Sequence, residues 1–185
     1  MAMKNPTKTY RLALIGVMTA ILCILGPLSI PLPFSPVPLS LTNFAILLAV
    51  FLLGWKWGTV SCGIYLLLGL VGVPVFSGFS GGMAKLLGPT GGYLVGFLLL
   101  AVISGLFVEK FEQDRLPVAA GMALGMLVDD LFGTLWLAIL MKLSFGQALM
   151  MGVVPYLAGD AVKLIVALLL GSALRRRLQA MRILV

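Results

Sequence analysis

The sequence predicts an all-α, polytopic membrane protein with six transmembrane helices. Of its 185 residues, 61% are hydrophobic and 10% are charged, whereas a soluble domain is about 45–50% apolar and about a quarter charged. Apolar runs long enough to cross a hydrocarbon core about 30 Å thick recur along the whole chain. Six spans need about 120 residues, which leaves too few for a soluble domain. We therefore expect residues 1–185 to form a single membrane domain.

The predicted spans follow the apolar runs and the glycine, proline and charged residues that separate them. They are residues 11–28, 39–55, 58–75, 91–108, 117–141 and 153–174. The first run resembles a secretory signal because basic residues precede it, but it lacks a small-residue cleavage site and continues into Pro27. We interpret it as an uncleaved first helix.

The basic residues predict the orientation, because cytoplasmic flanks of membrane helices are enriched in lysine and arginine. Of the 13 basic residues, ten fall on one set of flanks: Lys4, Lys8, Arg11, Lys56, Lys110, Arg115, Arg175, Arg176, Arg177 and Arg182. The opposite connections hold Lys85 and Lys142, and Lys163 lies inside the sixth span. We expect a plasma-membrane protein with both termini in the cytoplasm. The net charge of +7 is then a topology signal, and no nucleic-acid partner is expected.

The residue inventory excludes several kinds of active site. The chain has no histidine, which excludes histidine-based triads and His-ligated zinc or haem. Its two cysteines, Cys23 and Cys62, each lie in an apolar run and are interpreted as packing residues. We expect no metal and no cofactor.

Two connections on the outer side are unusual. Residues 27–38 hold five of the ten prolines, which block helix and favour a stiff, extended segment. Residues 73–93 hold six glycines in an apolar stretch, and non-helical backbone at membrane depth is tolerated where protein buries it or where it lines a cavity. The sequence therefore predicts a rigid cap and a glycine-rich loop over an outward-facing pocket.

Charged residues inside the last span need an explanation, because an ionisable group at mid-bilayer costs about 2.5–3.5 kcal/mol on insertion scales. Asp160 and Lys163 are spaced i, i+3, and Tyr156 extends their face into a polar stripe. One interpretation is a structural ion pair. The other is an acceptor and a donor side by side in a cavity for a small polar group.

Two further aspartates lie in the fifth span. Asp129 continues the small-residue series Gly121, Gly125 and Gly133 at i+4 spacing, which is typical of a close-packed helix seam. We expect one of Asp129 and Asp130 to face the interior and meet a donor such as Lys163, and the other to point toward Thr134 or an interface.

A second small-residue face lies in the first span, where Ala13, Gly16 and Ala20 are spaced i, i+3 and i+7. This face predicts either an internal seam or a docking surface for another membrane subunit.

Two catalytic or conducting alternatives stay open from the residues alone. Residues 78–82 match the G-x-S-x-G nucleophile pattern, so a serine enzyme would use Ser80 with Lys85 or Lys163 as base. An ion or proton conduit would run through Asp129, Asp130 and Asp160. We expect neither an enzyme nor a channel.

The string from Gly81 to Phe97, GGMAKLLGPTGGYLVGF, resembles the loop-and-helix signature of the BioY biotin-transporter family. The proline-rich segment through Pro36-Val37-Pro38 and the late Pro155-Tyr156-x3-Asp160-x2-Lys163 pattern are also similar to it. Together the three landmarks span nearly the whole chain, in the order expected for that family.

The resemblance implies a six-helix substrate-capture (S) component of an energy-coupling-factor (ECF) transporter, which binds biotin near the outer surface and delivers it to the cytoplasm. It implies that Asp160 and Lys163 line the biotin site with residues of the glycine-rich loop. The full set of substrate-binding residues expected is Asp160, Lys163, Tyr156, Asn43, Phe79, Gly82, Lys85, Gly88, Thr90, Gly91 and Tyr93. Phe79 and Tyr93 would be walls for the thiophane ring and the valeryl chain, Asn43 a further hydrogen-bonding group, and Lys85 a partner for the valerate carboxylate.

The resemblance also implies partners. A transmembrane coupling subunit would dock on Ala13, Gly16 and Ala20, and two ATPase subunits would supply any ATP hydrolysis. The S component would reorient against the coupling subunit after capturing biotin. A solitary carrier that needs no ATPase is the closest alternative.

Overall fold

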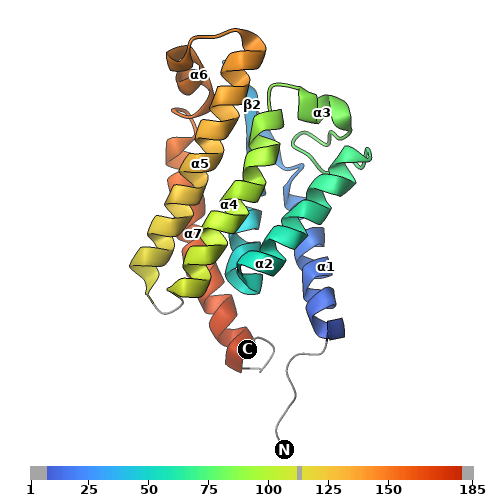
Figure 1. Cartoon of the computed structure of the whole chain (residues 1–185), viewed down its shortest axis with the longest axis vertical. Helices are drawn as coiled ribbons and strands as arrows, with labels where there is room; N and C mark the ends of the chain where they lie inside the picture. Colours follow the sequence, from blue (N-terminus) through green and yellow to red (C-terminus); the bar gives the residue numbers. More distant parts are fainter. Residues whose placement is uncertain (1–7, 112–113, 181–185) are drawn as a thin grey trace, which may run out of the picture.

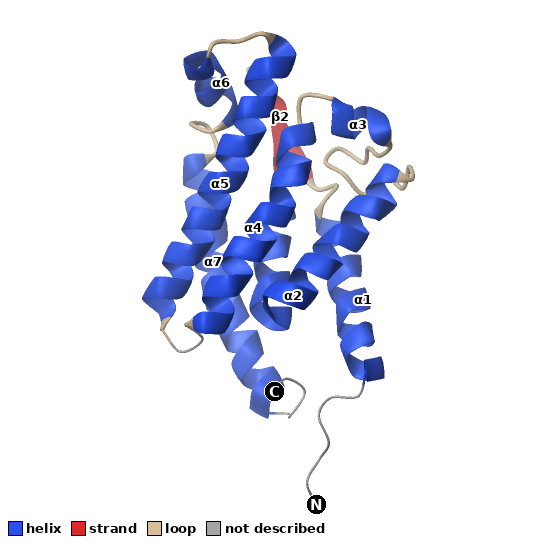
Figure 2. Ribbon diagram, viewed as in Figure 1, coloured by secondary structure: helices blue, strands red, loops and turns tan. Residues whose placement is uncertain are grey.

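The computed structural model describes residues 8–111 and 114–180 (Figures 1 and 2). Lys4 and Arg182, which the orientation prediction used, lie outside these residues. The described elements are α1 (Lys8–Leu25), β1 (Ser29–Leu32), β2 (Ser35–Ser40), α2 (Thr42–Leu70), α3 (Met83–Leu87), α4 (Gly91–Lys110), α5 (Arg115–Met141), α6 (Phe145–Gly152) and α7 (Leu157–Ala180). The fold is mostly helical, as predicted, with one short β-hairpin that was not.

Four of the described helices, namely α2, α4, α5 and α7, are long and apolar enough to cross a membrane. Helix α1 is a shorter apolar helix. Their lengths and compositions fit a multi-pass membrane protein. Helices α4 and α5 match the predicted fourth and fifth spans to within two residues at each end.

Helix α2 combines the second and third predicted spans, which meet at a sharp kink. Gly54 has φ 77° and ψ 178° inside the helix, a conformation that glycine adopts without the steric cost that a Cβ brings. In Figure 1 the two arms of α2 form a V whose tip lies toward the end of the molecule where α4 finishes and α5 begins. One glycine therefore reverses the direction of the chain inside an element that is otherwise continuously helical.

The first arm of α2 is the centre of the core. Residues from Ala45 to Phe51 are all buried, and α2 packs against α1, α4 and α7. An arm that is apolar all round can be buried all round, which explains why this helix lies inside the bundle while α7 keeps an apolar outer face exposed.

The predicted small-residue seam of α5 is confirmed, and its partner is α4. A Cβ on Gly121 would lie 2.1 Å from the Phe107 ring, and one on Gly133 would lie 2.3 Å from the Tyr93 ring. Side chains at these positions would push the helices apart. The α4–α5 pair is the most extensive contact between elements in the described chain.

The connections between the helices differ from the prediction in two places. The proline-rich segment is extended, as predicted, but it folds into an antiparallel hairpin in which Ser29 pairs with Ser40 and Leu32 with Ser35, so the predicted second span begins at Thr42 instead of residue 39. Helix α6 fills the connection before the predicted sixth span, which begins at Leu157 instead of residue 153. A capping box between Ser144 and Gln147 starts α6.

The third predicted span is also too long, because helix α2 ends at Leu70 instead of residue 75. The chain then turns through Gly72, where φ is 104°, and Val75 and Phe76 are buried against the bundle. An apolar run that packs on protein as irregular backbone has the same composition as one that continues a helix.

Candidate functional site

A small cavity opens among β2, α2, α4, α5, α6 and α7, near the hairpin end of the bundle. Its lining consists of Val37, Pro38, Ser40, Asn43, Tyr93, Phe97, Asp130, Gly152, Tyr156, Asp160 and Lys163. The walls are apolar and aromatic, with a few polar groups that converge from different helices. Such a composition is typical of a small-molecule binding site.

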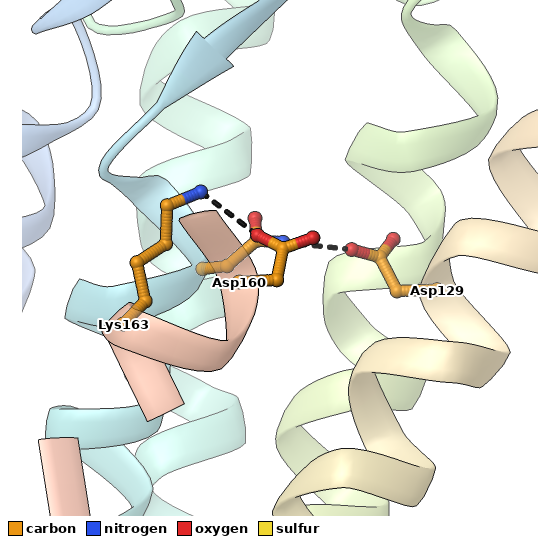
Figure 3. Close-up of polar contacts among 4 residues, drawn as sticks. Asp129, Asp160 and Lys163 are labelled. Atoms are coloured by element: carbon orange, nitrogen blue, oxygen red, sulfur yellow. Dashed lines mark hydrogen bonds and ion pairs between the residues drawn. The ribbon is translucent and has the colours of Figure 1, made fainter. Parts of the chain in front are cut away.

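The ion pair of α7 lies in this cavity. Lys163 Nζ is 3.0 Å from Asp160 Oδ1, and the two side chains are only 10% and 11% exposed. Asp160 sits in the first turn of α7, where the unpaired backbone N–H groups of the helix favour a negative charge. In Figure 3 the carboxylate of Asp160 lies between Lys163 and Asp129. The predicted polar face of the last span is therefore turned toward the protein interior.

The hydroxyl of Tyr156 contacts the β-hairpin on one side of the cavity. This hydroxyl donates to the Val37 carbonyl oxygen, and Ser35 Oγ lies 2.8 Å from the same hydroxyl. Ser35 Oγ in turn donates to the Met151 carbonyl oxygen at 2.8 Å. The extended segment that the prolines impose thus becomes one wall of the cavity, held by side chains distant in sequence.

On another side of the cavity, the hydroxyl of Tyr93 connects α4 to the end of α6. This hydroxyl donates to the Gly152 carbonyl oxygen at 3.0 Å and lies 3.4 Å from Thr134 Oγ1. A Cβ on Gly152 would lie 2.3 Å from that hydroxyl, so glycine is needed for α6 to approach α4. The tyrosine positions the end of α6 beside the cavity.

The two aspartates of α5 have different surroundings. Asp129 is fully buried; its Oδ2 accepts a hydrogen bond of 3.5 Å from Asn43 Nδ2, while its Oδ1 has no hydrogen-bond partner among the described residues. Asp130 lines the cavity. The sequence predicted that one of them would face the interior; in the structure both are buried, and Asp130 is the one on the cavity wall.

Five of the predicted substrate-binding residues come together around the cavity: Asn43, Tyr93, Tyr156, Asp160 and Lys163. The other six are outside its lining: Phe79, Gly82, Lys85, Gly88, Thr90 and Gly91. They belong to the glycine-rich segment around α3, and their contact with a ligand stays a prediction.

That glycine-rich segment packs mainly on its neighbours. Phe79 is 68% exposed, and a Cβ on Gly91 would lie 1.6 Å from the Leu86 carbonyl oxygen. Trp136 Nε1 of α5 donates to the Gly88 carbonyl oxygen at 3.0 Å. Partial burial lowers the pKa of Lys85. In this structure the glycines serve tight turns and close packing.

Several cavity residues were not predicted from the sequence. Val37, Pro38 and Ser40 line it because the hairpin folds back over the bundle, and Gly152 because α6 ends there. Phe97 lies one helical turn after Tyr93 on α4, a spacing that places both on one face. Among these unpredicted residues, Phe97 is the one that the sequence could have indicated, through its spacing from Tyr93.

The small-residue face of α1 is exposed. Ala13, Gly16 and Ala20 lie at the surface, and a Cβ on Gly16 would meet no atom within 4 Å. The opposite face of α1 packs on α2, where Thr19 Oγ1 lies 3.0 Å from Ser61 Oγ. The structure therefore excludes the internal seam as an interpretation of this face.

Among the described residues, no hydrogen bond joins Ser80 to Lys85 or to Lys163, the two bases of the serine alternative. Ser80 Oγ donates to the Ser77 carbonyl oxygen at 2.8 Å in a tight turn, whereas Lys163 is paired with Asp160 in the cavity. Within the described ranges, the structure has no group of three or more His, Cys, Asp or Glu side chains that could hold a metal ion.

Comparison with known proteins shows the family of the chain. The model of the BioY family matches residues 2–180. The biotin transporter BioY of Thermotoga maritima is 39% identical over 161 residues, which cover 87% of this chain and 93% of that protein. The biotin transporter BioY of Lactococcus lactis subsp. cremoris is 35% identical over 181 residues, with 95% of each chain covered.

The fold is also that of a solved structure. The crystal structure of an S-component for biotin from an ECF-type ABC transporter superposes with a TM-score of 0.87 at 36% identity and covers 95% of each chain. Sequence and fold agree over nearly the full length, and the chain is a member of the BioY family.

Proposed function

We propose that this protein binds biotin in the bundle cavity and mediates its uptake across the membrane. The observation that carries the proposal is the buried Asp160–Lys163 pair, which provides an acceptor and a donor inside a cavity with apolar walls. Biotin matches this chemistry, because its ureido ring has N–H donors and a carbonyl acceptor while its remaining atoms are largely apolar. The names of the relatives point to the same ligand.

Our proposal for the membrane topology is six crossings. Helix α1, the two arms of α2 on either side of Gly54, α4, α5 and α7 would each cross the bilayer. Helix α1 begins and α7 ends at the same end of the molecule, where α4 also ends and α5 begins (Figure 1). Because Lys110, Arg115 and Arg175 to Arg177 belong to those helix ends, the positive-inside rule assigns that end to the cytoplasm.

The cavity would then open toward the outer side. Biotin would enter beside the β-hairpin and α6, and the protein would release it to the cytoplasm after a reorientation in the membrane. The glycine-rich segment around α3 is on the same outer side in this topology, and Lys85, the only basic side chain on α3, is the group that we propose for the valerate carboxylate.

The energy would come from partner subunits. The solved relative is an S-component from an ECF-type ABC transporter, and the sequence of this chain has no match to the phosphate-loop motif that binds ATP. A transmembrane coupling subunit and two ATPase subunits would supply that step. The exposed Ala13, Gly16 and Ala20 face gives a flat surface on which another helix can pack closely.

Titration of the purified protein with biotin tests the ligand. We expect saturable binding by the wild-type protein and a large loss in Asp160→Asn and Lys163→Ala, because each variant leaves one member of a buried pair without its partner. Asp114→Asn and Lys142→Ala are the matched controls, since both side chains are exposed, and they should bind as the wild type does. Undiminished binding in both cavity variants would contradict the site.

Co-purification tests the partners. Gly16→Leu should reduce recovery of the coupling and ATPase subunits while biotin binding by the isolated protein stays intact. Gly63→Leu is the control, because a Cβ at Gly63 also meets no atom within 4 Å. Equal recovery with both variants would contradict docking on α1, and uptake by cells that lack an ATPase module would favour the solitary carrier.

A further inference from the structure

Asp130 is an acidic side chain in the cavity that the other described residues leave without a hydrogen-bond or ion-pair partner. It is 6% exposed and forms part of the cavity lining. Among the described residues, no hydrogen bond or ion pair involves its carboxylate. A nearly buried carboxylate without a partner is costly, and its position on a cavity wall indicates a ligand as the missing partner.

The neighbouring groups do not fill this role. Lys163 is engaged with Asp160, which lies on the same helix at 3.0 Å. The amide of Asn43 donates to Asp129, which is fully buried and is not a lining residue. Of the adjacent aspartates, Asp130 is therefore the one that a bound molecule can reach.

The charged groups of the cavity wall indicate which ligand group would match them. They are two carboxylates, Asp130 on α5 and Asp160 on α7, and one ammonium group, Lys163. Carboxylates accept hydrogen bonds and an ammonium group donates them. The complementary ligand group has two N–H donors and one acceptor, which is the pattern of a cyclic urea.

We propose that Asp130 is a specificity-determining residue that accepts a hydrogen bond from one ureido N–H of biotin, while Asp160 accepts from the other N–H and Lys163 donates to the ureido carbonyl oxygen. The proposal rests on biotin being the ligand and assigns a role to a residue outside the motif that identifies the family. Since these three groups carry a formal charge of −1, they also direct the valerate carboxylate of biotin away from them.

Asp130→Asn tests the proposal, because it keeps the shape of the side chain and removes the charge. Hydrogen bonds to charged groups are the strong ones, so we expect the Kd for biotin to rise about 10- to 100-fold. Asp129→Asn is the matched control: its carboxylate is adjacent in sequence but outside the lining, and its Kd should change less than about 3-fold. An unchanged Kd in Asp130→Asn, or an equal rise in both variants, would overturn the assignment.

Thermal unfolding of the same variants without ligand separates binding from structure. Because Asp130 is buried without a partner, Asp130→Asn should leave the unfolding temperature unchanged or raise it. A fall in unfolding temperature that accompanies the weaker binding would show a structural role and overturn the proposal.

Ligands methylated on one ureido nitrogen provide an independent readout. One of the two isomers should bind the wild-type protein more weakly and suffer no additional loss in Asp130→Asn, since the same hydrogen bond is already absent. If both isomers lose the same factor in both proteins, Asp130 does not contact the ring. Failure of the wild-type protein to bind biotin would instead contradict the proposed function.

Discussion

The Asp129 carboxylate occupies the space that a side chain at position 96 would need: a Cβ on Gly96 would lie 2.2 Å from Asp129 Oδ1. Gly96 is on α4 and Asp129 on α5. The absence of a side chain on one helix therefore accommodates a buried acidic group on the other, next to the cavity. The two positions depend on each other.

Gly96→Ala should consequently destabilise the protein by about 1–3 kcal/mol, because the added methyl group forces the buried carboxylate or the helix backbone to move. Thermal unfolding in detergent measures the effect. Gly63→Ala is the control, since its Cβ enters open space, and it should be neutral or stabilising because alanine favours helix. Equal stabilities of the two variants would contradict the close packing of α4 on α5.

Much of the helical architecture is predictable from the sequence, and the reason is physical. Helices α4 and α5 coincide with the predicted spans because a membrane helix must be apolar over a fixed length and must end where charged or turn residues begin. The hairpin is less predictable. Prolines indicate extended backbone, but they do not define the pairing of Ser29 with Ser40, and the hairpin is contacted through Ser35 and Val37 by Met151 and Tyr156, which are distant in sequence.

The kink of α2 was also predictable only in part from the sequence. The sequence predicts a break between the spans 39–55 and 58–75, but the chain remains helical up to and beyond a single residue with φ 77°, Gly54, which lies just inside the second predicted span. Gly54→Ala should cost about 1–3 kcal/mol, since a residue with a Cβ is strained at φ 77° and ψ 178°. A drop in unfolding temperature, compared with the neutral Gly63→Ala, checks this; an unchanged temperature would mean that the kink tolerates another backbone geometry.

The candidate site was predictable only in part. The spacing of Tyr156, Asp160 and Lys163 places them on one helix face, and the structure places all three at the cavity. Which of Asp129 and Asp130 lines the cavity depends on the rotation of α5 about its axis, which adjacent residues in one helix do not define. The glycine string identifies the family but does not separate glycines that serve turns from any that contact a ligand.

Tyr156→Phe should weaken biotin binding by loosening the hairpin wall. The variant removes the hydrogen bond that the hydroxyl donates to Val37, worth about 0.5–1.5 kcal/mol, together with the polar contact to Ser35, while the ring that lines the cavity remains. We expect a lower unfolding temperature and a Kd raised several-fold, both measured on the purified protein. Tyr10→Phe, at an exposed tyrosine of α1, should have neither effect. A normal Kd in Tyr156→Phe would show that the hairpin keeps its position without this contact.

Lys85 predicts a pH dependence of stability. Partial burial lowers its pKa below the ordinary value of 10.5, so the unfolded chain binds the proton more tightly than the folded protein does. The charged lysine then destabilises the fold fully below the lowered pKa, and this cost disappears as the pH rises to about 10.5.

Lys85→Gln removes the charge, so it should be more stable than the wild type at neutral pH, by a margin that shrinks toward pH 10.5. Lys85→Arg is the control, because arginine stays protonated and its difference from Lys85→Gln should persist at high pH. Denaturant unfolding of the three proteins across this range measures the margins; a margin between wild type and Lys85→Gln that widens with pH would contradict the sign of the shift.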